Sequence, residues 1–255
     1  MNLPKDLQKK NFYDIMLKMK PTSGWEILAK NNLLALKAGA KIPLINFVWG
    51  DATLENIEAI KKFYVHHSFI WLLTLEQNDM HLLNAGFKGP DQSPEMVLCL
   101  DNYEIEGYLS DIKVIIAESD EQLNQWTQVA SEAFEKAPAD LKEFFEPLIK
   151  VGGAKPFLIY YKNMPAATSL VYCNNNIAGI YAVSALEKFR RKGLGKAATL
   201  ACIREAKNRN ISNAVLYASP MGKFLYESMG FKISQTLNEY FFMNQKEKAN
   251  PDINP

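Results

Sequence analysis

The sequence predicts a mixed α/β protein, because strand-like and helix-like runs alternate along the chain and three strand-like runs follow one another in its second half. The chain has 255 residues, of which 48% are hydrophobic and 22% charged. This is the composition of a folded protein, and the length fits one large domain or two small ones. The polar stretch 101–111 is the best candidate boundary. We therefore expect an N-terminal α/β domain at 1–105, a second domain at 112–245 and a flexible tail at 246–255.

The first half of the sequence contains both helix-like and strand-like runs. Apolar residues at helical spacing predict helices, and short apolar runs rich in branched and aromatic residues predict strands. A stretch of Gly, Pro, Asp, Gln and Ser at 89–94 predicts a turn between the last two elements. The expected helices are 5–19, 25–38, 52–65 and 78–87, and the expected strands are 43–49, 69–73 and 95–101.

The second half begins again with a strand, and its first helix has Ser119 or Asp120 as a plausible N-cap. Two short turn sequences separate the three successive strands, which predicts an antiparallel part joined by hairpins. The expected order is strand 112–118, helix to about 135, helix 139–151, strands 156–161, 166–173 and 177–185, helix 193–208, strand 214–219, helix 221–229 and a terminal strand pair at 231–242.

The charge balance excludes several classes of partner. The 29 Lys and Arg residues against 28 Asp and Glu leave a net charge of +1, which argues against nucleic acid and against an anionic membrane surface as the main partner. No run approaches the roughly 18 to 20 apolar residues of a membrane helix, and the N-terminus lacks the apolar core of a secretory signal. Oligomeric state has no signal in the sequence.

Cysteine and histidine usage gives no sign of a metal site. An odd number of widely spaced cysteines in apolar contexts predicts buried free thiols in a reducing compartment, and hence a cytoplasmic location. Only Asp79 and Glu76 lie near His81, at poor ligand spacing, so we expect no bound metal. The residues concerned are Cys99, Cys173, Cys202, His66, His67 and His81.

The most informative segment is FRRKGLGK, residues 189–196, at a junction between a strand and a helix. Gly193 and Gly195 allow backbone amides to approach a ligand closely, and the following helix begins with unpaired N–H groups. Such a junction binds anions, and the surrounding Lys and Arg residues favour a phosphate or pyrophosphate. A P-loop is excluded because residue 190 is not glycine and Ala197 replaces the hydroxyl. A dinucleotide fingerprint is weak because the expected acidic residue is missing at 212–216.

The spacing R-x-x-G-x-G, from Arg190 to Gly195, resembles that of the GNAT superfamily of acyl-CoA-dependent N-acyltransferases. The strand AGIYAVSA, the spacer LEKF and the loop RRKGLGKAA match the family's central strand, pyrophosphate loop and helix in order. The later YASPMGKFLYESMGF, residues 217–231, resembles its second signature. The resemblance covers roughly residues 112–242 and implies a GNAT-like acyltransferase fold that uses acetyl-CoA as co-substrate.

The resemblance also implies roles for individual residues. Backbone groups at the end of the central strand would pair with the pantetheine arm, and the loop amides with a lysine would hold the pyrophosphate. Tyr226 stands where the family has the tyrosine that protonates the departing thiolate, while a neutral amine attacks the thioester directly. The alternative is that Tyr226 has only a structural role, as an aromatic core residue of an amphipathic helix. The implied CoA-binding residues are Val183, Ser184, Ala185, Arg190, Arg191, Lys192, Gly193, Leu194, Gly195 and Lys196.

The sequence departs from the family pattern at Glu187, where many members have proline, and at Ala185, where the closest subgroup has threonine. No Glu or His lies on the central strand to act as a general base. Glu187, Glu132 and a water relayed to bulk remain open for that role.

The function expected from this resemblance is transfer of an acetyl group from acetyl-CoA to a primary amine, with a small molecule as acceptor. A non-catalytic acyl-CoA sensor and a protein-directed acyltransferase are the alternatives. The phrase LLNAGF at 82–87 echoes the Gly-Phe signature at 230–231. The N-terminal half is therefore either a degenerate half of the same fold, without a phosphate loop, or a helical cap particular to this protein.

Overall fold

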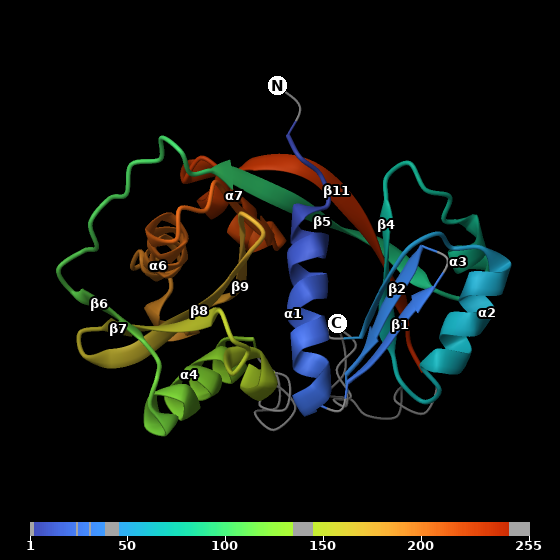
Figure 1. Ribbon diagram of the computed structural model, residues 1–255, viewed down its shortest axis with the longest axis horizontal. Coiled ribbons are helices and arrows are strands. Elements are labelled where there is room, and N and C mark those ends of the chain that lie inside the picture. Colours follow the sequence, from blue (N-terminus) through green and yellow to red (C-terminus); the bar gives the residue numbers. More distant parts are fainter. Residues whose placement is uncertain (1–2, 24, 31, 39–45, 135–144, 245–255) are drawn as a thin grey trace. The chain divides into compact units, whose positions relative to one another are not determined.

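The computed structural model describes residues 3–23, 25–30, 32–38, 46–134 and 145–244 (Figure 1). The expected tail at 246–255, and parts of the expected strand 43–49 and helix 139–151, lie outside the described residues. Contacts divide the chain into two compact units that alternate along the sequence. Unit 1 comprises Met1–Met19 with Glu95–Ser234, and unit 2 comprises Lys20–Pro94 with Gln235–Pro255. The contiguous domains 1–105 and 112–245 stay a prediction.

Unit 1 contains most of the elements expected for the second half. The cap of its first helix forms as predicted, because the Ser119 side chain accepts from the amide of Gln122, and the Gln122 side chain returns to the cap. Its elements in chain order are α1 (Leu7–Ser23, the last residues of which enter unit 2), β6 (Ile112–Ile116), α4 (Asp120–Ala133), β7 (Ala154–Tyr161), β8 (Met164–Asn174), β9 (Ile177–Ala185), η2 (Glu187–Phe189), α6 (Leu194–Asn208), β10 (Asn213–Tyr217) and α7 (Pro220–Ser228).

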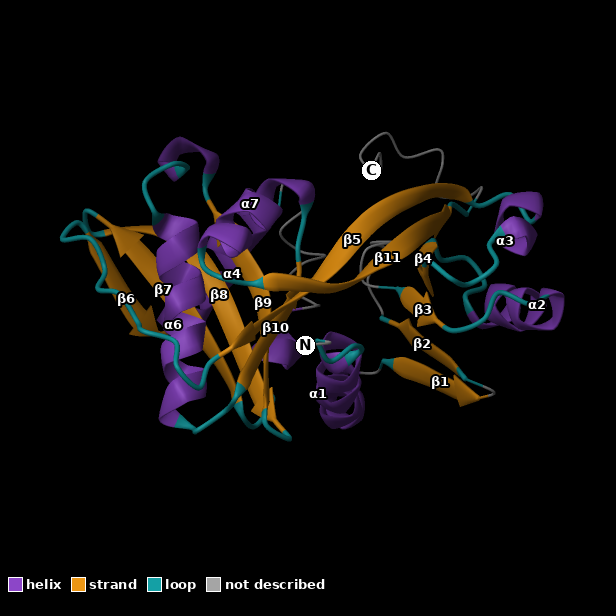
Figure 2. Cartoon of the chain, turned by 90° about the horizontal axis from the view of Figure 1, so that it is seen from above, coloured by secondary structure: helices purple, strands orange, loops and turns teal. Residues whose placement is uncertain are grey.

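Two long strands, β5 (Lys88–Cys99) and β11 (Lys232–Phe242), contribute residues to both units. In unit 1 the strand order is β5-β10-β9-β8-β7-β6, in which β9 and β10 are parallel and the other pairs antiparallel. Helix α6 packs on one face of β7–β9 and α4 on the other (Figures 1 and 2). A large core of β-strand and α6 side chains lies under α6 and α7.

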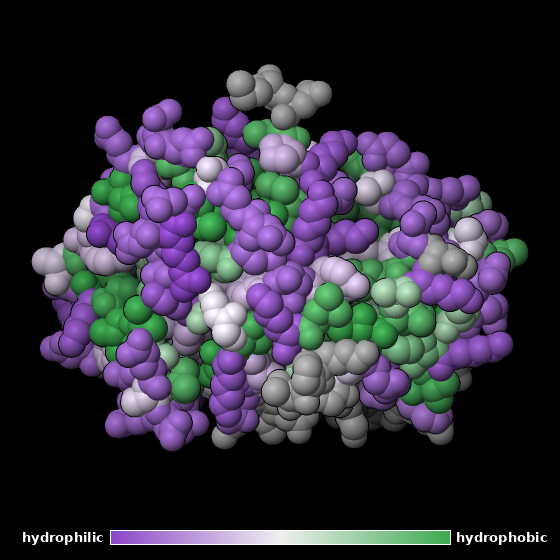
Figure 3. All heavy atoms as spheres, in the orientation of Figure 1, coloured by the Kyte–Doolittle hydropathy of each residue, from purple (hydrophilic) through white to green (hydrophobic). Residues whose placement is uncertain are grey.

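Unit 2 has its own core and a similar strand order. Its further elements are β1 (Glu26–Lys30), β2 (Leu33–Lys37), β3 (Phe47–Trp49), α2 (Leu54–Phe63), β4 (Phe69–Thr74) and α3 (Met80–Asn84). The order is β1-β2-β3-β4-β11-β5, with β3 parallel to β4 and with β11 antiparallel to β4. Polar and charged side chains cover much of the face drawn in Figure 3, while these apolar cores are inside.

Four predictions from the sequence are wrong. The expected helix 25–38 is the hairpin β1–β2, because residues 33–36 are buried on both faces of the sheet and so lack the alternation of a half-buried strand. The expected turn 89–94 lies inside β5, where a Cβ on Gly89 would come within 2.5 Å of the Glu239 carbonyl of β11. The expected terminal pair is the single strand β11, and Cys99 is exposed.

Candidate active site

The parallel strands β9 and β10 part after a short stretch of pairing. Their ladder joins Ile177–Gly179 to Asn213–Val215, although β9 continues to Ala185 and β10 to Tyr217. On its other edge β9 stays paired with β8 as far as Ala185. Residues 180–185 therefore have backbone groups on an open strand edge, which can pair with an extended ligand as a further strand would. The predicted residues Val183, Ser184 and Ala185 lie on this edge.

A bulge in β9 shapes this open edge. Ala182 has a positive φ of 50°, and the β8–β9 register shifts between Thr168 and Leu170. The Thr168 hydroxyl donates to the Ala182 carbonyl at 2.9 Å and lies 2.7 Å from the Ser184 hydroxyl, which can then act as donor. Because the Ser184 side chain is buried against Thr168, that residue offers only its backbone to a ligand. Thr168 was missed from the sequence, since a bulge depends on pairing and has no local motif.

The predicted pyrophosphate loop follows β9 and leads into α6. Gly193 is the N-cap of α6 with a φ of 78°, and no side chain caps this helix. The amides of the first helical turn are thus left for an external acceptor. A Cβ on Gly195 would lie 2.9 Å from Leu225 Cδ2, so any larger residue here requires the Leu225 side chain to move. These features fit a bound pyrophosphate.

The cations around the loop carry mostly solvent-exposed charge. Lys188 lies 3.9 Å from Glu132, and Arg190 lies 4.0 Å from Glu187. Lys196 is held more closely, with its Nζ 2.6 Å from Glu106 Oε2. Arg191 and Lys192 are exposed beside Gly193. Ion pairs of this exposed kind contribute little to stability, so the cations can turn to an anionic ligand at small cost.

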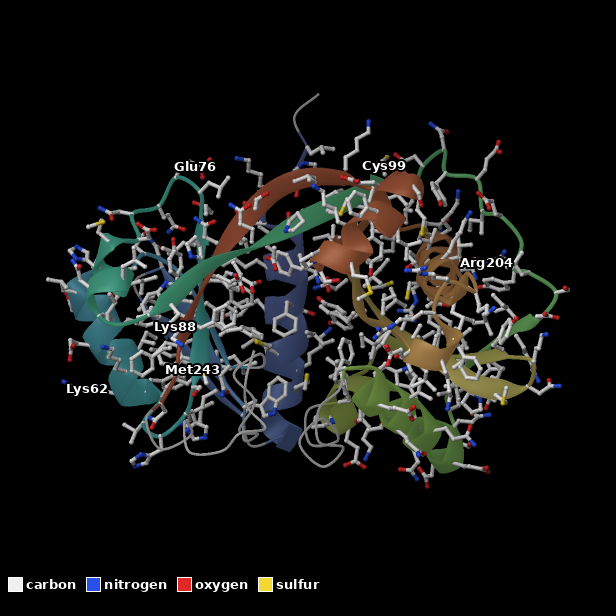
Figure 4. The ribbon with its side chains drawn as sticks, turned by 180° about the vertical axis from the view of Figure 1, so that it is seen from behind. Lys62, Glu76, Lys88, Cys99, Arg204 and Met243 are labelled. Atoms are coloured by element: carbon white, nitrogen blue, oxygen red, sulfur yellow. The ribbon has the colours of Figure 1, made fainter. Side chains whose placement is uncertain are left out.

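The polar stretch 101–111 runs along α6 next to this loop. Arg204 of α6, labelled in Figure 4, donates to the Glu106 carbonyl at 2.6 Å and stacks over the Tyr108 ring. A Cβ on Gly193 would meet Leu109 at 3.2 Å. The expected boundary stretch therefore forms one wall of the candidate site, which its composition did not indicate.

Tyr226 lies on α7, and its ring contacts Phe231 edge-on. The side chain is buried, and among the described residues its hydroxyl makes no hydrogen bond. Burial raises the pKa of Tyr226 well above its usual value, and the neighbouring Cys202 adds to this effect. A phenol with a raised pKa stays protonated at neutral pH, so it can donate a proton. Its packing also fits the core-aromatic interpretation.

The open candidates for a general base, Glu187 and Glu132, lie on the surface. Their side chains are 84% and 57% exposed, and each is beside a loop cation. The described residues contain no cluster of His, Cys, Asp and Glu suited to a metal ion. None of the helices that can be described is long and apolar enough to span a membrane.

Comparison with known proteins agrees with this geometry. Residues 120–231 match the family described as acetyltransferase (GNAT) family. A GCN5-related N-acetyltransferase from Kribbella flavida is similar in structure with a TM-score of 0.70 and 16% identity, over 98% of this chain and 99% of that one. A GCN5-related N-acetyltransferase from Sphaerobacter thermophilus has a TM-score of 0.62 and 11% identity, over 94% and 93% of the two chains.

A third solved structure is a tandem GNAT protein from the clavulanic acid biosynthesis pathway, with a TM-score of 0.59 and 11% identity over 95% of this chain and 96% of that one. A sequence search of curated proteins gives no match. The predicted mixed α/β fold and the family resemblance are confirmed. The individual site residues stay predictions.

Proposed function

We propose that this protein, of which residues 120–231 match the GNAT acetyltransferase family, transfers the acetyl group of acetyl-CoA to a primary amine of a small molecule. The observation that carries the proposal is the pairing of an open strand edge with an uncapped helix in unit 1. The free edge of β9 and the N-terminus of α6 are joined by the basic loop 186–193. One ligand with an extended arm and a pyrophosphate matches both parts.

In this proposal each part of the site has a defined task. The backbone of Val183 to Ala185 pairs with the pantetheine arm, and the amides of Arg190 to Gly195 with Lys196 hold the pyrophosphate. A strand amide of β9 polarises the thioester carbonyl towards attack. The neutral amine attacks the carbonyl carbon and gives up one proton to a base or to water, the C–S bond breaks, and Tyr226 donates its proton to the sulfur. Acetyl-CoA supplies the activated acetyl group, and the chain supplies position and protons.

We propose that unit 2 contains no second acetyl-CoA site. Its strand order repeats that of unit 1, including the single parallel pair, which supports a degenerate second half of the same fold. The tandem arrangement named for a structure of similar fold supports the same interpretation.

Charge reversal in the loop tests the CoA site. Arg190→Glu places a negative charge beside the pyrophosphate, so acetyl-CoA binding should weaken about tenfold or more in calorimetric titration. Lys113→Glu is the matched control, since Lys113 is an exposed cation of unit 1 on β6. Equal affinity of Arg190→Glu and the wild type would overturn the pyrophosphate assignment.

Thiol release over an amine panel tests the reaction. Ethanolamine, glucosamine, spermidine and tyramine represent small acceptors, and a lysine-containing peptide represents protein substrates. We expect release with a small amine and a fall in kcat of about 10²-fold in Tyr226→Phe. Tyr160→Phe, which loses only a hydrogen bond to Gln125, should keep the wild-type rate. Binding of acetyl-CoA without any turnover would favour the sensor, and release with the peptide alone would favour the protein-directed enzyme.

A further inference from the structure

Three ionisable side chains lie in one row across the strands where β9 and β10 part. Tyr217 of β10 is paired directly with Glu95 of β5. Val215 of β10 is paired with Gly179 of β9. Tyr217 lies two residues beyond Val215, and Tyr181 lies two residues beyond Gly179. Because side chains alternate between faces with a period of two, Glu95, Tyr217 and Tyr181 point to the same face of the sheet.

This face is the one covered by α1. A hydrophobic cluster on the same face of the sheet as the row joins Leu7 of α1 to Val97, Val215 and Ile177. The Tyr181 hydroxyl lies 2.5 Å from Asn11 Oδ1, also on α1. Gly179 is needed at this point, because a Cβ there would lie only 2.0 Å from the same oxygen.

Tyr226 belongs to the opposite face. It packs in the core under α6 and α7 with Met96, Leu216 and Ile180, which alternate along the strands with the residues of the row. The gap between β9 and β10 thus separates Tyr226 on one face from the row on the other.

Glu95 is the carboxylate of the row and is fully buried. The Ser234 hydroxyl donates to its Oε1 at 2.7 Å, and the amide of Gln8, in the first turn of α1, donates to its Oε2 at 3.3 Å. These two donors fix the carboxylate beside Tyr217, its cross-strand neighbour. Tyr217 and Tyr181 continue the row from Glu95 on the two strands that border the gap, β10 and β9.

We propose that the acceptor amine binds on the α1 face of the gap, against Tyr181 and Tyr217, and that Glu95 takes up its proton through the Tyr217 phenol. The proposal rests on the proposed function. The amine nitrogen forms the new C–N bond and gives one proton to the phenol oxygen of Tyr217, which passes its own proton to Glu95. The C–S bond breaks and Tyr226 protonates the sulfur. Exchange with water then returns Glu95 and Tyr226 to their starting states.

This assignment supplies the base that the surface residues Glu187 and Glu132 do not. Burial, with the nearby charges of Tyr217, Tyr172 and Asp14, raises the pKa of Tyr181, so that phenol stays protonated beside the amine. The titratable or charged groups that face the row are Tyr217 from β10, Tyr181 from β9, Tyr172 from β8, and Asp14 and Lys18 from α1, with Ser234 of β11 and the Gln8 amide as uncharged donors.

A double-mutant cycle tests the relay. Glu95→Gln and Tyr217→Phe should each lower kcat/KM for the most reactive panel amine about 10²-fold, and the double variant should fall no further. All three should keep the wild-type affinity for acetyl-CoA. The wild-type rate should level off at alkaline pH. The rates of the variants should keep rising, because without the relay the proton leaves to solvent hydroxide, whose concentration rises with pH.

Glu205→Gln is the matched control, since Glu205 is a buried carboxylate of unit 1 whose partners are Lys155 at 2.8 Å and Arg209 at 2.5 Å. It should lose stability yet keep the wild-type pH profile. If Glu95→Gln does not fold, Tyr217→Phe alone decides the result through its rate and pH profile. The proposal is overturned if Glu95→Gln and Tyr217→Phe keep the wild-type dependence of rate on pH. It is also overturned if the losses of kcat/KM in the two single variants multiply in the double variant. A wild type that releases no thiol with any amine removes both proposals, and that is seen before any variant is made.

Discussion

The two units contain the same strand-to-helix junction with opposite properties. In unit 1, β9 runs well beyond its pairing with β10, and α6 begins without a side-chain cap. In unit 2, β3 is paired with β4 along its whole length, from Phe47 to Trp49. Four residues separate it from helix α2, whose N-terminus is capped by Thr53, the side chain of which accepts from the Asn56 amide. The same fold thus leaves a gap and an open helix end in unit 1 and closes both in unit 2.

Hydrogen bonds from neighbouring side chains also occupy the loop between β3 and α2 in unit 2. Trp71 Nε1 donates to the Gly50 carbonyl at 2.9 Å, and Gln77 and Asn56 donate to Asp51. The acidic Asp51 and Glu55 lie where unit 1 has cations. An anion would meet repulsion at this junction and find its donors in use. The same strand order thus gives an open junction in unit 1 and a closed one in unit 2, because β9 extends beyond its parallel partner whereas β3 does not.

The largest effect we expect concerns the two cores. Trp71 in unit 2 and Trp126 in unit 1 are both fully buried, and each donates its indole N–H to a backbone carbonyl. Either Trp→Ala change should lower the free energy of unfolding by about 3–5 kcal/mol, measured by denaturant titration. A cost below about 1 kcal/mol for one of them would show that its unit lacks a core of comparable packing.

The next effect concerns the bulge in β9 beside the gap of unit 1. Thr168→Val removes the hydroxyl that bonds the Ala182 carbonyl and should cost about 1–3 kcal/mol of stability. It should also weaken acetyl-CoA binding, because the open edge of β9 loses its fixed shape. Thr127→Val is the control, since that hydroxyl bonds only the Leu123 carbonyl of its own helix. Unchanged CoA affinity in Thr168→Val would separate the bulge from the site.

A smaller effect is expected at the closed junction of unit 2. Thr53→Ala removes the cap of α2 and should cost about 1 kcal/mol in thermal or chemical unfolding. Acetyl-CoA affinity should stay at the wild-type value, because this helix end has no role in binding. A loss of affinity here would contradict the division of roles between the units.

The smallest effect is expected from Glu106, which pairs with Lys196 beside the loop. Glu106→Gln frees the lysine for the pyrophosphate, so affinity should rise by a few-fold at most, equivalent to about 0.5 kcal/mol or less for an exposed pair. The gain should shrink as salt is added. Glu104→Gln, a change at an exposed neighbour, should leave the affinity as it was.

Features with a local signal were predictable from the sequence. The glycines and cations of 189–196 stand together, the Ser119 cap is a short motif, and each element from 112 to 229 has clear periodicity or turn residues. The hairpin at 26–37 was not predictable, because burial on both faces removes the alternation that marks a strand.

Features that depend on distant pairing had no signal. The Ala182 bulge arises from the register of β8 against β9, and the row of Glu95, Tyr181 and Tyr217 joins residues from three separated strands. The participation of β5 and β11 in both units likewise depends on which strand pairs with which. The loop 189–196 therefore has a signal in the sequence, and its anion-binding role stays a prediction, whereas the groups that shape the gap beside it have no such signal.

The most direct test of the comparison is the stoichiometry of acetyl-CoA binding to the wild-type chain by calorimetric titration. We predict one site per chain, in unit 1, and an affinity for acetyl-CoA that falls about tenfold or more in Arg190→Glu. Two sites per chain, or one site indifferent to the charge at Arg190, would contradict the assignment of CoA binding to the junction of β9 and α6.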